Sequence, residues 1–231
     1  MALSRFFLVI LSVLLPILLN SQPAIEETST HAPDLYTVQQ SLMQYHDNGQ
    51  YEHEIQMVVD KAKKHLETRI AQKQQRPLAI VLDIDETALS NWQELKTMQF
   101  HYDKNYWLNW EQSKQAIAIK PILDLYYYAL DNHIHVFFIT AREESVRKVT
   151  EDNLKQAGYT SDNIVYFTPE NNPYKNSADY KTAMRKKITD QGYDIVLSIG
   201  DQYSDLCGGY ADALVKLSNP FYYIPGCIAS P

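Results

Sequence analysis

Asp83 and Asp85 are two carboxylates, two residues apart, that could together catalyse a reaction. They lie in the segment Asp83-Ile84-Asp85-Glu86-Thr87, directly after an apolar run. An ionised carboxylate can attack phosphorus and form an aspartyl-phosphate, which divides one difficult displacement into two easier ones. A second carboxylate two residues on, kept partly protonated, can donate a proton to the leaving alkoxide and then accept one from the attacking water. The pair is suited to phosphate-ester cleavage, but Asp-x-Asp alone is a common pattern that usually has no catalytic role, so further residues must support the interpretation.

Three further residues have side chains that suit the same chemistry: Thr140, Lys181 and Asp201. A hydroxyl and an ammonium group can hold phosphate oxygens, because phosphoryl transfer mainly requires positioning and charge neutralisation. Carboxylates that stay ionised beside a phosphate dianion need a hard divalent cation, and Mg²⁺ prefers carboxylate, phosphate and water oxygens. Each residue alone also has an ordinary interpretation: Thr140 as a strand-end cap, Lys181 as a solvated helix residue and Asp201 as part of a turn.

Four short apolar runs must bring these residues together, and such runs are typical of strands buried on both faces of a sheet. The runs are 78–84, 134–139, 164–167 and 195–199. Helical patterns lie at about 34–75, where a turn at 47–49 separates two helices, and at 121–132, 143–157 and 180–191. Strands that alternate with helices predict a parallel α/β sheet with right-handed crossovers. Because ligands bind beyond the carboxyl ends of the strands in such a sheet, the candidate residues are expected to meet at one edge.

The segment 83–91 resembles the first motif of the haloacid dehalogenase (HAD) superfamily, in the DxDET variant of the class B-like acid phosphatases of subfamily IIIB. This group includes plant acid phosphatases, vegetative storage proteins and bacterial lipoprotein phosphatases that act as 5′-nucleotidases. Other segments similar to the family are 138–143, 180–185, 199–206 and 217–225. The resemblance implies a HAD-like Rossmannoid three-layer α/β fold with a central parallel sheet, a small helical cap inserted after the first strand, and N-terminal helices.

The resemblance also implies a role for each matching residue. Asp83 is expected to be the nucleophile and a Mg²⁺ ligand through its carboxylate. Asp85 is expected to be the general acid and base, and to offer its backbone carbonyl to the metal. Thr140 and Lys181 are expected to bind the phosphoryl group, and Asp201 to be a further Mg²⁺ ligand.

Three residues are expected to support this site. Asp205 would act on the metal directly, through water, or by orienting Lys181. Arg142 and Arg185 are interpreted as structural residues or as residues that contact the site's side chains from behind.

The function that the resemblance implies is an exported, Mg²⁺-dependent acid phosphatase that hydrolyses small phosphomonoesters, with nucleoside 5′-monophosphates among the candidates. Two alternatives stay open: a non-catalytic storage or binding protein on the same scaffold, and a phosphotransferase in which an alcohol replaces water. The isoelectric point of about 5.5 and the absence of Lys/Arg runs argue against a nucleic-acid polymer as partner. The 45% of hydrophobic residues and the 17 Tyr argue against a disordered chain.

The N-terminus resembles a targeting segment. Residues 1–22 are interpreted as a signal peptide, because Arg5 precedes an apolar stretch over 6–19 that is shorter than the roughly 20 residues of a transmembrane helix. An uncleaved anchor remains the alternative. Residues 23–33 are expected to form a flexible leader and 34–231 the phosphatase domain. No cysteine lies directly after the apolar stretch, so no lipid anchor on an N-terminal cysteine is expected. A periplasmic or secreted protein is predicted.

The cap is predicted at about 91–120 because this segment is too long for a simple turn. Its aromatic residues are Trp92, Phe100, Tyr102, Tyr106, Trp107 and Trp110. These rings could stack on a nucleobase or dock the cap on the core, and docking is favoured for most of them. Cys207 and Cys227 can form the chain's only intramolecular disulfide, but the sequence leaves open whether they do.

Overall fold

A five-stranded parallel sheet forms the centre of the fold in the computed structural model, which describes residues 32–160 and 162–227. The predicted signal peptide lies outside these residues. The strands, in sheet order, are β5 (Ile164–Thr168), β4 (His135–Glu143), β1 (Leu78–Leu82), β6 (Asp194–Gly200) and β7 (Ala213–Lys216), and every neighbouring pair is parallel. The four predicted strands are thus present, and the short edge strand β7 is the one that the sequence analysis missed.

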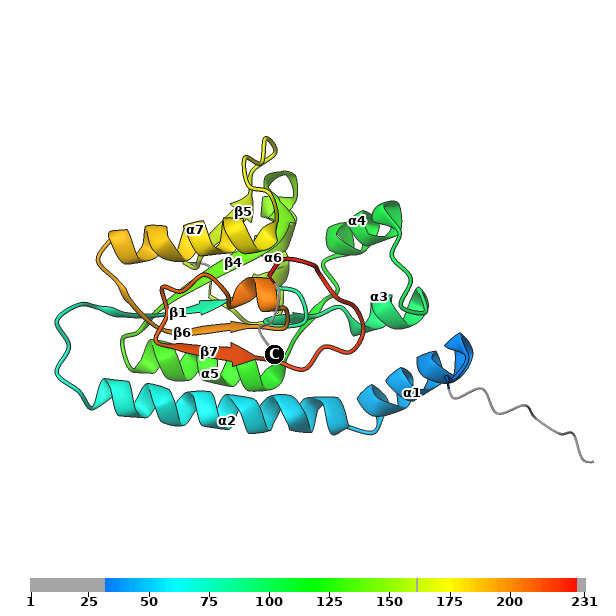
Figure 1. Ribbon diagram of the computed structural model, residues 1–231, viewed down its shortest axis with the longest axis horizontal. Coiled ribbons are helices and arrows are strands. Elements are labelled where there is room, and N and C mark those ends of the chain that lie inside the picture. The colour runs from blue at the N-terminus through cyan, green and yellow to red at the C-terminus, as the bar shows by residue number, and fades with distance from the viewer. Residues whose placement is uncertain (1–31, 161, 228–231) are drawn as a thin grey trace, which may run out of the picture. The chain divides into compact units, whose positions relative to one another are not determined.

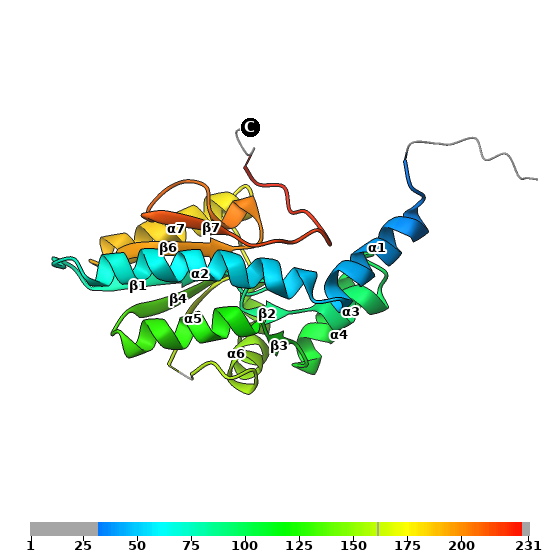
Figure 2. The same cartoon turned by 90° about the horizontal axis from the view of Figure 1, so that it is seen from below.

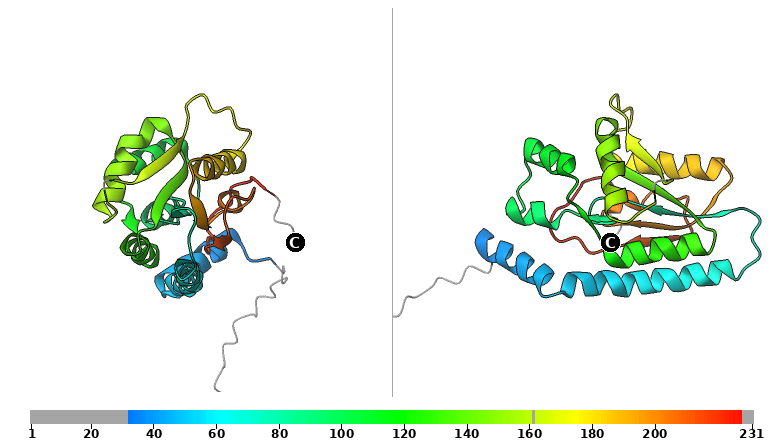
Figure 3. Two further views of the ribbon diagram at one scale, coloured as in Figure 1. Left: turned by 90° about the vertical axis from the view of Figure 1, so that its left-hand side faces the viewer. Right: turned by 180° about the vertical axis from the view of Figure 1, so that it is seen from behind.

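Helices cover both faces of this sheet within the compact unit that begins at Asp34. One face is covered by α2 (Gln50–Ile70), α5 (Lys120–Asp131) and α6 (Arg147–Gln156), and the other by α7 (Ser177–Asp190), as the end-on view in Figure 3 shows. Figure 2 shows α2 and α5 side by side across the sheet. The expected three-layer α/β fold with a central parallel sheet is therefore confirmed.

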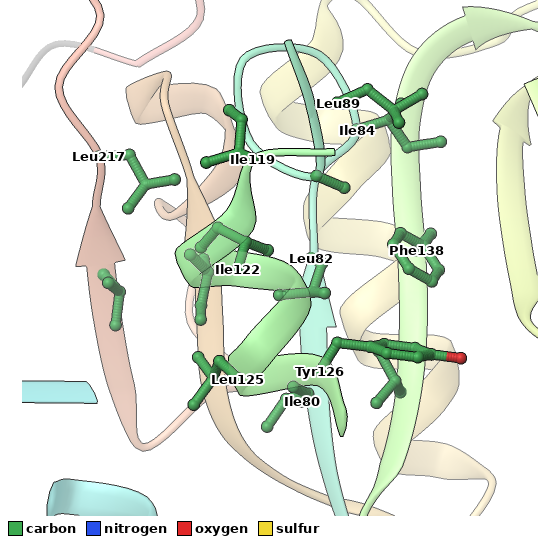
Figure 4. Packing of buried hydrophobic residues seen from close by; sticks show 14 of the residues in the cluster. Ile80, Leu82, Ile84, Leu89, Ile119, Ile122, Leu125, Tyr126, Phe138 and Leu217 are labelled. Atoms are coloured by element: carbon green, nitrogen blue, oxygen red, sulfur yellow. The ribbon is translucent and has the colours of Figure 1, made fainter. Parts of the chain in front are cut away.

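The core follows from the alternation of side chains along the buried strands. Ile80 and Leu82 of β1 pack toward Leu125 and Tyr126 of α5 (Figure 4), whereas Val81 belongs to the cluster on the α7 side. Every residue of β1 is buried. A strand sandwiched in this way reads as a continuous apolar run, which explains why it is visible in the sequence.

Local backbone conformation and side-chain hydrogen bonds, rather than hydrophobicity, set the boundaries of several helices. The predicted turn at 47–49 is present between α1 (Leu35–Asp47) and α2, and Gly49 adopts a left-handed conformation there with φ of 84°. The second helix ends at Ile70 rather than near residue 75. The α7 helix begins at Ser177, before the predicted position, because the side chain of Asn176 accepts a hydrogen bond from Asp179 N–H.

The cap is inserted between β1 and α5 and lies beyond the carboxyl end of β1 (Figure 1). It consists of β2 (Leu89–Ser90), α3 (Trp92–Thr97), α4 (Lys104–Ser113) and β3 (Ile117–Ala118), with β2 and β3 antiparallel. Trp92 stacks on His46 of α1 with ring centroids 3.8 Å apart and also packs against Phe221. This aromatic side chain therefore joins the cap to α1 and the C-terminal segment.

Cys207 and Cys227 form a disulfide, with their Cα atoms 6.6 Å apart. The bond joins the segment after β6 to the C-terminal segment. No helix in the described part of the chain is long and apolar enough to span a membrane.

Replacing both cysteines by serine is expected to lower the free energy of unfolding by about 3 kcal/mol, because the bond closes a loop of roughly 20 residues in the unfolded chain. Urea unfolding of the oxidised wild type and the double variant measures the difference. The reduced wild type should match the variant, and equal midpoints for all three would contradict the prediction.

Candidate active site

Three carboxylates meet at the carboxyl ends of β1 and β6. Asp83 follows β1, while Asp201 and Asp205 follow β6, and one oxygen from each lies within 4.8 Å of the others. The two strands are neighbours in the sheet, and Asp83 N–H donates to Ile199 O at 3.0 Å, which continues their pairing to the site. All three side chains are buried. The predicted convergence of Asp83 and Asp201 at one edge is present.

Lys181 lies between two of these carboxylates. It projects from α7 and its Nζ donates to Asp83 Oδ1 and to Asp205 Oδ1, each at 2.5 Å. Burial lowers the pKa of Lys181, but the charges of Asp205 and Asp83 outweigh it and raise the pKa above its ordinary value. A charged ammonium group is thus fixed beside Asp83. Of the roles considered for Asp205, the geometry shows its contact with Lys181, and its place in the group of three carboxylates also allows it to hold a cation directly.

The site carries more negative groups than Lys181 can neutralise. Burial raises the pKa of Asp83 well above its ordinary value, and the neighbouring Asp205 and Asp201 add to the shift. Burial and Asp205 raise the pKa of Asp201 to about 7. Crowded, desolvated carboxylates that resist ionisation fit a hard divalent cation, which prefers oxygen ligands and removes the repulsion. Asp83, Asp201 and Asp205 are the residues that could hold it.

Asp85 points to a different set of partners. Its carboxylate accepts from Arg142 Nη2 at 2.6 Å and from Arg142 Nε at 3.1 and 3.2 Å, and Asn91 Nδ2 donates to Oδ1 at 2.8 Å. Burial raises the pKa of Asp85, but Arg142 and Asn91 outweigh it and hold the pKa below its ordinary value. This ion pair, which the sequence did not reveal, favours the ionised form of Asp85, and its role as general acid and base stays a prediction.

Thr140 lies in β4, the neighbour of β1 on the other side, and is buried. Phe138 pairs with Leu82, so Thr140 is two residues beyond that pair, at the level of the Asp83 loop. Its hydroxyl accepts from Arg142 N–H at 3.1 Å. Thr140 therefore lies within β4, three residues before its end at Glu143 rather than at the expected strand end, and outside the group of three carboxylates.

Arg185 is a fully buried side chain of α7 beneath the loop that carries Asp205. Its guanidinium donates to the carbonyl oxygens of Asp205 at 2.6 Å and Gly209 at 3.0 Å, and to that of Cys207. These bonds satisfy backbone groups that would otherwise be buried without partners. Arg185 therefore holds the loop and does not contact the carboxylates of the site.

Five further polar residues, to which the sequence analysis assigned no role, complete the site: Gln202, Asn219, Tyr222, Glu86 and Thr87. Gln202 and Asn219 each donate to Asp201 Oδ2 at 2.6 Å. Tyr222 donates to Glu86 Oε2 at 2.7 Å, and the hydroxyl of Thr87 accepts from Asp201 N–H at 3.1 Å. All five lie inside segments that resemble the family, but nothing in their residue types indicated which carboxylate each would contact.

Gly200 allows the Asp205 side chain to approach the backbone of β6. A Cβ atom at Gly200 would overlap the Asp205 side chain. We expect Gly200→Ala to lower the free energy of unfolding by about 1–3 kcal/mol, as overpacking does, and to weaken divalent-cation binding by displacing Asp205. Urea unfolding and calorimetric titration with Mg²⁺ measure the two effects.

The matched control is Gly192→Ala, which strains a left-handed turn with φ of 98° but meets open space. It should lower stability without changing the affinity for the cation. Equal cation affinity in Gly200→Ala and wild type would contradict the prediction.

The sequence matches the HAD superfamily, subfamily IIIB (acid phosphatase), over residues 18–225. The chain belongs to this family. The Class C acid phosphatase from Bacillus anthracis has a similar fold, with a TM-score of 0.69 and 21% identity over 82% of this chain and 86% of that one. The expected family is thus confirmed.

Plant proteins are also similar to this family member. Acid phosphatase 1 from Solanum lycopersicum is 32% identical over 154 residues, which are 62% of this chain and 58% of that protein. Vegetative storage protein 2 from Arabidopsis thaliana is 30% identical over 149 residues, which are 63% of this chain and 56% of that protein. The matched part spans less than three fifths of the length of each of these two curated relatives.

Proposed function

We propose that this chain is an exported, Mg²⁺-dependent acid phosphatase that hydrolyses small phosphomonoesters through an aspartyl-phosphate on Asp83. The observation that carries the proposal is the buried group of Asp83, Asp201 and Asp205, with Lys181 fixed 2.5 Å from Asp83. Family membership and the similarity to a named acid phosphatase support it.

The chain's own residues have complementary tasks in this reaction. Asp83 attacks phosphorus, the ester P–O bond breaks, and Asp85 transfers a proton to the departing oxygen. Asp85 then accepts a proton from water, which attacks the aspartyl-phosphate, and inorganic phosphate leaves as the Asp83 carboxylate is regenerated. Lys181 and Thr140 hold phosphoryl oxygens. Asp83, Asp201 and the Asp85 carbonyl would hold Mg²⁺, with Asp205 in support, and the bound ion would supply positive charge that offsets the repulsion between the carboxylates and the phosphate dianion.

Turnover of p-nitrophenyl phosphate by the purified chain at mildly acidic pH tests this proposal. We expect hydrolysis with Mg²⁺ and none with EDTA, and restoration when the metal is returned. A panel of nucleoside 5′-monophosphates and glycerol phosphates would then show the preferred class of ester. No turnover by folded, metal-loaded protein would overturn the proposal.

A storage role is the second candidate, because one similar plant protein is named a vegetative storage protein. Both carboxylates on which catalysis would depend are present here, Asp83 in the acidic group and Asp85 in its own ion pair. Inactivity in the assay above would favour storage. The phosphotransferase alternative predicts that adding glycerol makes the phosphate released smaller than the ester consumed.

Export is proposed from the N-terminal sequence, and the Cys207–Cys227 disulfide supports it because such bonds persist in oxidising compartments. N-terminal sequencing of protein recovered from outside the cytoplasm is expected to show that the signal peptide has been removed. Protein retained in the cytoplasm at full length would contradict export.

A further inference from the structure

We propose that the cap helix α4 positions the carboxyl group of Asp85, with Trp110 acting through the side-chain amide of Asn91. The inference rests on the proposed function, in which Asp85 moves the proton to and from the ester oxygen. Trp110 does not contact Asp85 itself, so it is a positioning residue rather than a catalytic one.

A chain of hydrogen bonds connects the two residues. The indole Nε1–H of Trp110 donates to Asn91 Oδ1 at 2.7 Å, and Asn91 Nδ2 donates to Asp85 Oδ1 at 2.8 Å and to Glu86 Oε2 at 3.2 Å. An indole N–H can only donate, so it selects the amide orientation whose oxygen faces Trp110. The reverse orientation would turn the amide oxygen toward two carboxylates. Trp110 thereby ensures that Asn91 presents its donor group to Asp85.

This contact fixes one of the two oxygens of Asp85. Oδ1 accepts from Asn91 Nδ2 at 2.8 Å and from Arg142 Nη2 at 2.6 Å, whereas Oδ2 accepts from Arg142 Nε at 3.1 Å. Among the hydrogen bonds of the described residues, Oδ1 is therefore the anchored atom. Oδ2 retains the capacity to carry a transferable proton. Anchoring Oδ1 from two sides determines where Oδ2 points.

The buried side of α4 is directed at both partners of Asp85. Trp110 and Glu111 are the two buried residues of this helix. Trp110 contacts Asn91, and Glu111 Oε1 lies 3.7 Å from Arg142 Nε. The position of the cap helix is therefore linked to each group that holds the carboxylate. A helix that served only to cover the site would not need this polar connection.

The competing interpretation is that Trp110 merely packs the cap on the core, since its ring belongs to the main hydrophobic cluster. Trp110→Phe distinguishes packing from positioning, because it keeps an aromatic ring and removes the indole N–H. Asn91→Ala removes the amide itself. A double variant shows whether both residues act on Asp85 by the same route.

The readout is kcat/KM for two Mg²⁺-saturated substrates, p-nitrophenyl phosphate and glycerol 2-phosphate. Nitrophenolate departs readily without a proton, whereas an alkoxide requires one from the general acid. We expect each single variant to lose about tenfold more activity toward the alkyl ester than toward the aryl ester, a part of what general acid catalysis contributes. The double variant should show no additional selective loss.

Asn109→Ala is the matched control, because Asn109 is the exposed neighbour of Trp110 on the same helix. It should leave the ratio of the two kcat/KM values unchanged. Equal losses toward both esters, or selective losses that add in the double variant, would overturn the inference while leaving the proposed function intact. Wild-type protein that hydrolyses neither ester would overturn both.

A melting curve of each variant shows whether it folds. If Trp110→Phe does not fold, Asn91→Ala supplies the test through two measurements. A selective loss toward the alkyl ester together with faster hydrogen exchange of the Trp110 indole N–H supports the proposal. An unchanged ester ratio or an unchanged exchange rate overturns it.

Discussion

Asp83→Asn is expected to reduce turnover of p-nitrophenyl phosphate by roughly 10⁴-fold or more, as loss of the covalent nucleophile does in other enzymes. An amide oxygen is a poor nucleophile, but it can still accept the hydrogen bond that Lys181 donates to Asp83. The variant should therefore fold while losing activity. The measurement compares initial rates with saturating Mg²⁺ and with EDTA.

The control for this substitution is Asp124→Asn, the same change at an exposed carboxylate that pairs with Lys120 on α5. Its rate should equal that of the wild type. Phosphate trapped by rapid acid quenching should be found on the peptide that contains Asp83, and only in protein with an intact Asp83. Wild-type rates in Asp83→Asn would show that another group attacks phosphorus.

The second large effect concerns stability in the absence of metal. Several buried carboxyl groups have raised pKa values in the fold: Asp83, Asp201, Glu86 and Glu111. Burial is the main cause of each shift, and it raises the pKa of Asp201, Glu86 and Glu111 to about 7. A raised folded pKa means that the unfolded chain releases these protons first as pH rises. These groups therefore stabilise the fold at acidic pH, and that stability is lost as pH rises toward 7.

We expect the free energy of unfolding in EDTA to fall by several kcal/mol between about pH 5 and pH 8, because each unit between folded and unfolded pKa is worth about 1.4 kcal/mol. His46 makes the fold more stable as pH rises, since burial lowers its pKa. This single contribution is smaller than the combined opposite effect of the four carboxyl groups. Urea unfolding at the two pH values measures the change.

Asp201→Asn is the matched variant for this effect, because it removes one of the four titrating groups and keeps the shape of the side chain. Its stability should depend less on pH than that of the wild type. Saturating Mg²⁺ should weaken or reverse the wild-type trend, since the cation binds the deprotonated carboxylates. Stability in EDTA that is constant or rises over this range would contradict the prediction.

The sequence determined most of the fold and the principal atoms of the site. Strands β1 and β6 are buried on both faces, so their apolar runs stand out without any structural information. Because parallel strands direct their carboxyl ends to one edge, Asp83 and Asp201 could be placed together from their positions alone. The edge strand β7 escaped notice since its four residues include an exposed Leu214 and give no long buried run.

Only the tertiary structure decided how these groups are paired. Lys181 bridges Asp83 and Asp205 across 98 and 24 residues of sequence, and Arg142 reaches Asp85 across 57. Local periodicity reports which side of an element is buried, but not which distant partner meets a given side chain there. The state of each carboxyl group depends on that partner, because burial alone raises its pKa whereas a neighbouring cation lowers it. The sequence therefore indicated which residues gather at the site, and the packing of the cap, α7 and the C-terminal segment set their charges and directions.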